Sequence, residues 1–204
     1  MNSAQPMPTA QERAEATSTG MAVALWARYT PDSTAIISPT GNRTFAQLNA
    51  NCNKLVRALR ARGLRAGDSV AILLGNRPEY AEAVFACSRA GLRYTPVNRY
   101  LGPDEVAYIC NDCQAAAIIG DTRYDRLLTD SSKLCPAVEV RLCVGGPVAG
   151  FEDYTTALAE QDGADIDDAQ LGARMLYTSG TTGRPKGVVR PPNYSTQLEA
   201  ITSA

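Results

Sequence analysis

The chain has 204 residues, of which 45% are hydrophobic and 20% are charged, and its formal net charge is −1. This composition is typical of a globular protein with one well-packed core, or about one and a half domains. A nearly neutral net charge indicates no extended polyanion-binding surface overall, so nucleic acid is not expected as a partner. No segment approaches the roughly 18 to 20 apolar residues of a membrane-spanning helix, so no transmembrane segment is expected.

The first 20 residues are polar and contain Pro6 and Pro8. They lack the basic and then apolar segments of a signal peptide. We therefore predict a flexible polar tail over residues 1–20 and a folded part over residues 21–204.

Six cysteines are present: Cys52, Cys87, Cys110, Cys113, Cys135 and Cys143. Cys110 and Cys113 form a C-x-x-C pair, but the chain has no second pair and no histidine. A zinc site would need about four such ligands. A redox pair is an alternative, which is disfavoured because both cysteines fall on the apolar face of a predicted helix. We predict that all six are reduced and mostly buried small hydrophobes in a cytoplasmic protein.

Helical and strand patterns alternate along the chain. Apolar residues at helical spacing predict a short helix over residues 21–30, and a strand is expected at residues 35–38. The clearest helix covers residues 44–63, because Thr44 and Gln47 form a capping box and Gly63 can end the helix. Further strands are predicted at residues 70–74, 94–97, 115–119, 138–144 and 173–178, and further helices at residues 78–90, from 103 onward, 124–131 and 151–160.

This alternation predicts βαβ units, and therefore an α/β fold whose mainly parallel sheet has helices on both faces. In such sheets, ligands bind at the carboxyl ends of the strands. Residues 161–170 interrupt the alternation with an acidic and polar segment. A cation site is one interpretation of these carboxylates; a solvated linker is the interpretation that we favour.

Residues 177–188 read Y-T-S-G-T-T-G-R-P-K-G-V and follow a predicted strand. Glycines allow backbone N–H groups to turn inward and form a concave nest for an anion. The neighbouring hydroxyls are donors, and Lys186 adds a compact positive charge that suits phosphate. This segment therefore predicts a site for a polyphosphate. A plain flexible turn is the alternative, which the particular order of residues disfavours.

The segment is not a Walker A loop, which requires G-x-x-x-x-G-K-S/T at the start of a helix. Counted from Gly180, the second glycine position holds Pro185, and Gly187 follows Lys186. Proline fixes φ and has no N–H group, so the loop cannot continue smoothly into a helix. Because the flanking residues are apolar, we predict a strand, the loop and a second strand.

The segment closely resembles the phosphate loop of the adenylate-forming (AMP-binding) superfamily, which includes acyl-CoA synthetases, peptide-synthetase adenylation domains and beetle luciferases. Residues 43–48 resemble the T-Y/F-x-E-L segment of this superfamily, with Gln47 in place of the usual acidic residue. Residues 75–80 and 91–98 are similar to its second conserved block. Within that block, Pro96 and Asn98 match the P-x-N of acyl-CoA synthetases better than the P-x-D of adenylation domains.

The resemblance implies the N-terminal part of the large adenylate-forming domain, in an acid–thiol ligase that works in two steps. A carboxylic acid, expected to be a fatty acid, attacks the α-phosphate of ATP, and the acyl-adenylate then transfers its acyl group to CoA. ATP, Mg²⁺ and CoA are the implied cofactors and co-substrates. Lys186 is the implied catalytic residue and also binds phosphate. The other implied phosphate-binding residues are Thr178, Ser179, Gly180, Thr181, Thr182 and Gly183.

The chain departs from the resemblance in two respects. The superfamily commonly has a histidine shortly after the loop, whereas this chain reads Arg190-Pro191-Pro192-Asn193. The sequence also ends at Ala204, within an expected helix, before the motifs for adenine, ribose, Mg²⁺ and acid and before the C-terminal domain. We therefore expect a fragment that is inactive alone. The alternatives are a module that loads a carrier protein and a non-catalytic binding module that keeps the fold.

Overall fold

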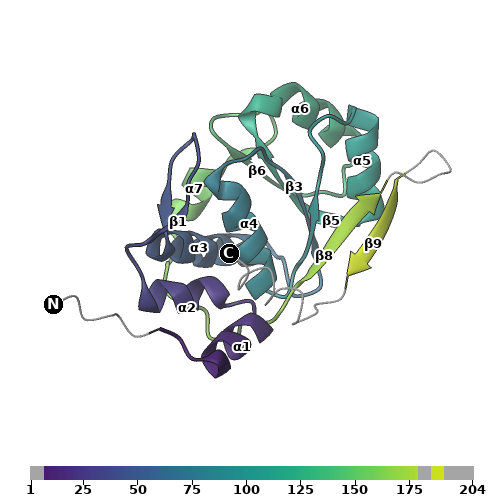
Figure 1. Ribbon diagram of the computed structural model, residues 1–204. Helices are drawn as coiled ribbons and strands as arrows, with labels where there is room; N and C mark the ends of the chain where they lie inside the picture. The colour runs from purple at the N-terminus through teal and green to yellow at the C-terminus, as the bar shows by residue number, and fades with distance from the viewer. Residues whose placement is uncertain (1–6, 179–184, 191–204) are drawn as a thin grey trace.

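A seven-stranded sheet runs through the molecule, and helices cover both of its faces (Figure 1). The computed structural model describes residues 7–178 and 185–190. The strands of the sheet lie in the order β7-β6-β5-β3-β4-β8-β9. Every neighbouring pair is parallel except β8 and β9, which are antiparallel. The predicted α/β fold with a mainly parallel sheet is confirmed.

The bounds of the elements follow the predicted alternation. The strands of the large sheet are β3 (Ser69–Leu73), β4 (Arg93–Pro96), β5 (Ala115–Asp121), β6 (Val140–Val144), β7 (Glu152–Asp153), β8 (Ala173–Thr178) and β9 (Lys186–Arg190). A small antiparallel pair is formed by β1 (Thr34–Ile36) and β2 (Arg43–Thr44). The helices are α1 (Ala10–Ser18), α2 (Ala22–Tyr29), α3 (Phe45–Ala61), α4 (Pro78–Arg89), α5 (Pro103–Asp112), the 3₁₀ turn η1 (Thr122–Tyr124), α6 (Asp125–Leu134) and α7 (Tyr154–Ala159).

The N-terminal segment differs from the predicted tail, because residues 10–18 form α1. Thr9 and Glu12 make a complete capping box at its start. The helix is attached to α2 by the hydroxyl of Tyr29, which donates to Glu12 at 2.7 Å. The polar composition did not exclude a helix here, because the capping box and the hydrogen bond from Tyr29 both stabilise it.

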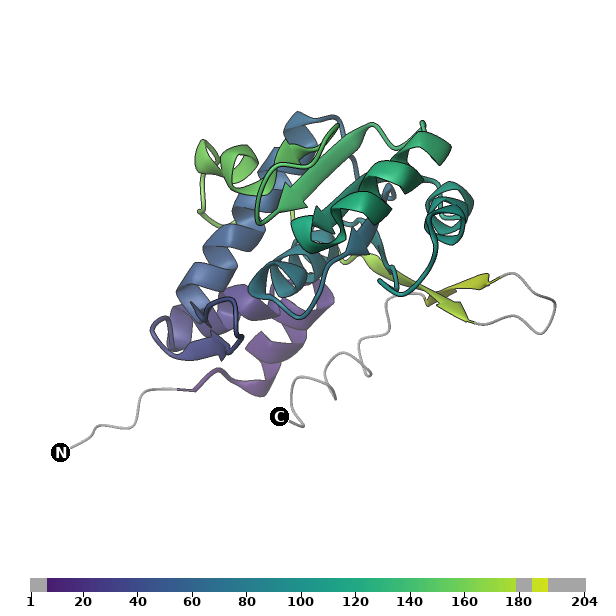
Figure 2. The same ribbon diagram turned by 90° about the horizontal axis from the view of Figure 1, so that it is seen from above.

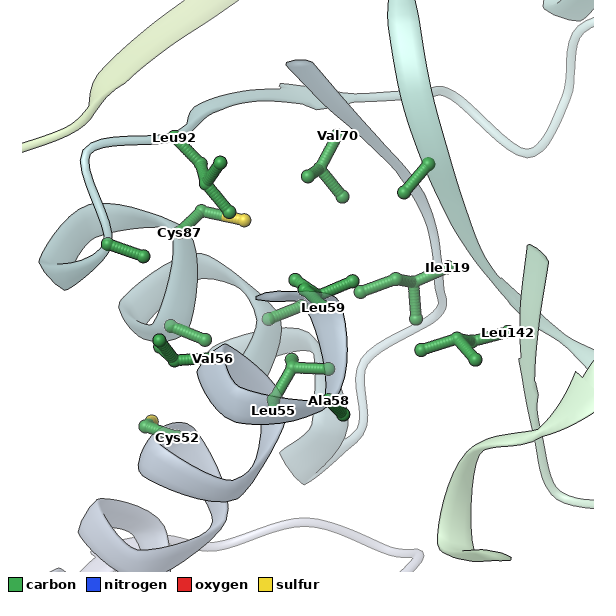
Figure 3. Close-up of a cluster of buried hydrophobic side chains, with 14 of the residues drawn as sticks. Cys52, Leu55, Val56, Ala58, Leu59, Val70, Cys87, Leu92, Ile119 and Leu142 are labelled. Atoms are coloured by element: carbon green, nitrogen blue, oxygen red, sulfur yellow. The ribbon is translucent and has the colours of Figure 1, made fainter. Parts of the chain in front are cut away.

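One core lies between the sheet and the layer formed by α2, α3, α4 and α7. The helix α3 begins with the predicted Thr44–Gln47 capping box. Its apolar residues Leu55, Val56 and Leu59 are fully buried. Leu59 lies beside Ile119 of β5, whereas Val56 lies toward α4, which carries Cys87 (Figure 3). The spacing of these residues in the sequence therefore identified the buried face of the helix.

A second core lies on the opposite face of the sheet, beneath α5 and α6. The strand β3 contributes to both cores, because Val70 and Ile72 belong to the first and Ala71 and Leu73 to the second. All six cysteines are free and buried, as predicted. Burial raises the pKa of Cys52 to about 12, so this thiol stays protonated and behaves as a small hydrophobe.

The acidic segment at residues 161–170 is attached to α3. Arg57 donates hydrogen bonds to the carbonyl oxygens of Asp162 at 3.0 Å and Ala164 at 2.7 Å. Asn53 donates to the carbonyl oxygen of Gly163 at 3.0 Å. The carboxylates are exposed, as expected of a solvated linker, but the backbone of the segment is docked on the helix.

Among the helices in the described part of the chain, we find none with the length and apolar content needed to cross a membrane.

Candidate nucleotide-phosphate site

The predicted phosphate loop connects the two strands of a hairpin. β8 and β9 pair in antiparallel register, with Tyr177 opposite Gly187 and Thr178 opposite Lys186. The two strands predicted on either side of the loop are therefore confirmed, and Thr178 and Lys186 face each other at the end of β8 and the start of β9. Both are exposed. The predicted site residues Ser179, Gly180, Thr181, Thr182 and Gly183 lie outside the described residues.

The hairpin lies at the edge of the sheet where parallel-sheet ligand sites are expected. β8 pairs with β4 through Arg93↔Ala173 and Tyr94↔Arg174 only, and the rest of the hairpin projects from the body of the molecule (Figure 2). Because β8 runs parallel to β3, β4 and β5, Thr178 follows the same carboxyl edge as the ends of those strands.

The aromatic ring of Tyr177 lies across Gly187 on the neighbouring strand. A Cβ atom added to Gly187 would lie 3.0 Å from the Tyr177 ring and 2.2 Å from the terminal methyl of Met175. Both distances are shorter than van der Waals contact, so a side chain at position 187 would have to displace the ends of the Met175 and Tyr177 side chains. The glycine after Lys186 therefore has a packing reason that the sequence pattern did not show.

Two side chains of α5 contact the hairpin. The hydroxyl of Tyr177 donates to Asp112 Oδ2 at 2.5 Å, and the hydroxyl of Tyr108 donates to the carbonyl oxygen of Pro185 at 3.2 Å. Burial, together with the hydrogen bond to Asp112, raises the pKa of Tyr177 well above its usual value. The phenol therefore stays protonated and can donate at neutral pH. Sequence analysis missed Tyr108 and Asp112; their spacing of four residues on a helix was the available signal.

An ion-pair network occupies the same carboxyl edge, next to β3 and β5. Asp121 is fully buried at the end of β5 and lies 3.1 Å from Arg77 and 2.6 Å from Arg123. Burial by itself would raise the pKa of Asp121, but hydrogen bonds from Arg123 and Arg77 outweigh it and lower this pKa to about 2. The carboxylate thus ties the loop after β3 to the turn after β5, and sequence analysis did not identify it.

An open groove of about 560 Å³ lies beside this network. Its lining combines the apolar side chains of Leu101 and Leu127 with three arginines, at positions 99, 123 and 126. Asp130 is the acidic residue among its lining side chains. The excess of positive charge suits an anionic group, although the arginines at the rim are solvated.

Comparison with known proteins decides the family. The chain matches the family described as AMP-binding enzyme over residues 23–200. It belongs to that family. This assignment agrees with the resemblance of the loop and with the position of the hairpin in the sheet.

Three relatives show how broad the family is. A feruloyl-CoA synthase from an Amycolatopsis species is 32% identical over 163 residues, which cover 80% of this chain and 31% of the relative. A probable non-canonical nonribosomal peptide synthetase, CymA, from Salinispora arenicola is 32% identical over 174 residues, which cover 80% of this chain and 2% of the relative. The crystal structure of the anthranilate CoA ligase AuaEII in complex with anthranoyl-AMP has a TM-score of 0.79 and 27% identity, covering 88% of this chain and 36% of that one.

The chain thus spans about a third or less of the length of these relatives. It corresponds to part of an adenylate-forming domain, and the family uses ATP. The relatives are divided between CoA ligases and nonribosomal peptide synthetases.

Proposed function

We propose that this chain supplies the phosphate-binding part of an AMP-forming acid–thiol ligase. Such an enzyme activates a carboxylic acid as its acyl-adenylate, releases pyrophosphate and transfers the acyl group to CoA. The observation that supports this proposal is the signature loop at residues 177–188, which connects the strands of a hairpin in a chain of the AMP-binding family.

The proposed roles follow from the chemistry of the loop. Residues 178–183 provide backbone N–H groups and hydroxyls for the β- and γ-phosphates of ATP. Lys186 neutralises the negative charge that grows as pyrophosphate departs. The loop therefore acts by positioning the nucleotide and by electrostatic stabilisation, which account for most catalysis of phosphate chemistry.

Mg²⁺ is expected to accompany the ATP. In residues 7–178 and 185–190, we find no group of three or more histidine, cysteine, aspartate or glutamate side chains that could hold a metal ion. We therefore assign none of the described side chains to Mg²⁺. Six buried free thiols support a reducing compartment, in agreement with the expected cytoplasmic location.

The identity of the carboxylic acid substrate is a more specific part of the proposal. The resemblance to acyl-CoA synthetases favoured a fatty acid. Two of the similar proteins are a feruloyl-CoA synthase and an anthranilate CoA ligase, which adds an aromatic acid as a second candidate. In both cases the reacting group is a carboxylate, so the chemistry at the phosphate loop is the same.

The test uses the enzyme that carries this sequence and measures acid-dependent exchange of pyrophosphate into ATP. Fatty, aromatic and amino acids are tried in turn. We expect exchange with one class of acid, followed by release of free acyl-CoA when CoA is added. An enzyme that binds ATP but shows no exchange with any acid would instead be the non-catalytic binding module.

Loading of a carrier protein is the second candidate function, and the similarity to a nonribosomal peptide synthetase supports it. Asn98 favours the CoA ligase, because it matches the P-x-N pattern. The two functions differ in their product. Acyl transfer to a carrier protein without any acyl-CoA would reject the CoA ligase and support the carrier-loading module.

A further inference from the structure

We propose that α5 holds the phosphate loop in position by fixing both strands of its hairpin. Tyr108 and Asp112 are assigned as positioning residues for the nucleotide. This inference rests on the proposed function, because it concerns the same loop. It adds two residues from a helix that lies about 70 positions earlier in the chain.

The two contacts reach opposite ends of the loop. Tyr108 binds the carbonyl oxygen of Pro185, which directly precedes Lys186. Asp112 binds the hydroxyl of Tyr177, which directly precedes Thr178. Residues four apart on a helix share a face, so one face of α5 contacts β8 at Tyr177 and the residue that directly precedes β9, Pro185.

The hairpin needs this support because its attachment to the sheet is short. The register of β8 with β4 comprises only Ala173 and Arg174 on the β8 side. Residues 175–178 extend beyond that pairing, with β9 alongside them. Met175 is buried in the core beneath α5, and the two hydrogen bonds then fix the outer part of the hairpin.

The helix itself is firmly held. Its opposite side buries Val106, Ile109 and Cys110, each of which is at most 2% exposed. Its first turn is closed by Glu105, whose carboxylate accepts a hydrogen bond from the N–H of Gly102 at 2.8 Å. A fixed helix can therefore hold the hairpin in one orientation.

The packing of Tyr177 on Gly187 links the two strands. Because the ring lies across β9, the hydrogen bond to Asp112 restrains both strands of the hairpin. The two flanking strands are therefore already held in place before a nucleotide binds, which lowers the ordering cost of binding.

The experiment compares Tyr108→Phe, Tyr177→Phe and Asp112→Ala in the enzyme that carries this sequence. Each change removes one partner of a hydrogen bond between α5 and the hairpin. Asp112→Asn keeps an acceptor and serves as the conservative variant. Tyr29→Phe is the matched control, because it removes a tyrosine–carboxylate hydrogen bond of 2.7 Å on α2, away from the hairpin.

We expect the KM for ATP to rise about threefold to tenfold in the three disruptive variants, which is the size of one lost hydrogen bond. The KM for the acid should change by less than about twofold, because the hairpin does not lose its fold. Asp112→Asn should lie closer to the wild type than Asp112→Ala. Tyr29→Phe should leave both constants unchanged.

Amide hydrogen exchange of residues 186–190 gives a second readout that requires no activity. We expect faster exchange in the three variants than in Tyr29→Phe, at similar melting temperatures. Unchanged exchange, or an unchanged KM for ATP in an active enzyme, would overturn the inference. A wild-type enzyme without acid-dependent exchange would refute the proposed function, whereas the amide measurement would still decide whether α5 fixes the hairpin.

Discussion

Lys186 places one ammonium group at the first position of β9, opposite Thr178. A point charge beside departing pyrophosphate stabilises the transition state more than the bound ATP. Thr181 would add one hydroxyl donor to the same cradle. These two residues therefore test the loop most directly.

We predict that Lys186→Ala lowers kcat/KM for acid-dependent pyrophosphate exchange by about 100-fold, the usual cost of one electrostatic group in a transition state. Thr181→Ala should lower it about tenfold, since it removes a neutral donor. Steady-state exchange assays measure both effects. Lys133→Ala, which removes a lysine paired with Asp130 on α6, is the control. Exchange rates in the Lys186 variant that equal those of this control would contradict the assigned role.

Asp121 makes the stability of the fold depend on pH. Its folded pKa is lowered from 3.8 to about 2, so it stabilises the folded state above its unfolded pKa. That contribution is lost as the pH falls from about 4 through about 2, because the proton then binds the unfolded chain first.

We predict that Asp121→Asn lowers the free energy of unfolding by about 2 kcal/mol at pH 7, from a pKa shift of nearly two units. Urea titrations at pH 7 and pH 3 measure this difference. It should shrink at pH 3, where the wild type is losing the same interaction. Asp130→Asn is the comparison, since its ion pairs are solvent-exposed and worth little. A difference that is as large at pH 3 as at pH 7 would show that charge is not its cause.

At the scale of elements, the sequence predicted those helices and strands whose formation depends on neighbouring residues. The capping box of α3 and the strands on both sides of the loop required only neighbouring residues. By contrast, the docking of residues 161–170 depends on Arg57 and Asn53, which lie more than 100 positions away. The hydrogen bonds between α5 and the hairpin join residues that are 65 and 77 positions apart. The spacing of Tyr108 and Asp112 places them on one face of α5, but it does not identify their partners.

We predict that Arg57→Ala detaches the acidic segment from α3. Cleavage within residues 160–168 by a protease specific for acidic residues should become about threefold to tenfold faster, because local opening exposes the backbone. Mass spectrometry of the products locates the cut. Arg126→Ala is the control, since the side chain of Arg126 is 98% exposed. Equal cleavage rates in the two variants would mean that Arg57 does not hold the segment.

At the scale of the whole molecule, the α/β class followed from the alternation of helices and strands. The order of the strands did not, because β3 lies between β4 and β5 and the chain crosses over it. Such crossovers depend on how separate βαβ units pack together, which the pattern within each unit does not specify. The position of the loop at the carboxyl edge was predictable because every parallel strand of the sheet ends there.

Successive side chains of β3 point to opposite faces of the sheet, and this limits where the chain can be split by protein engineering. Val70 and Ile72 need one helical layer as cover, whereas Ala71 and Leu73 need the other. Removing either helical layer would expose one apolar face of the sheet to water, so the two layers must form together. Any split pair or insertion made by protein engineering should therefore leave residues 69–144 intact.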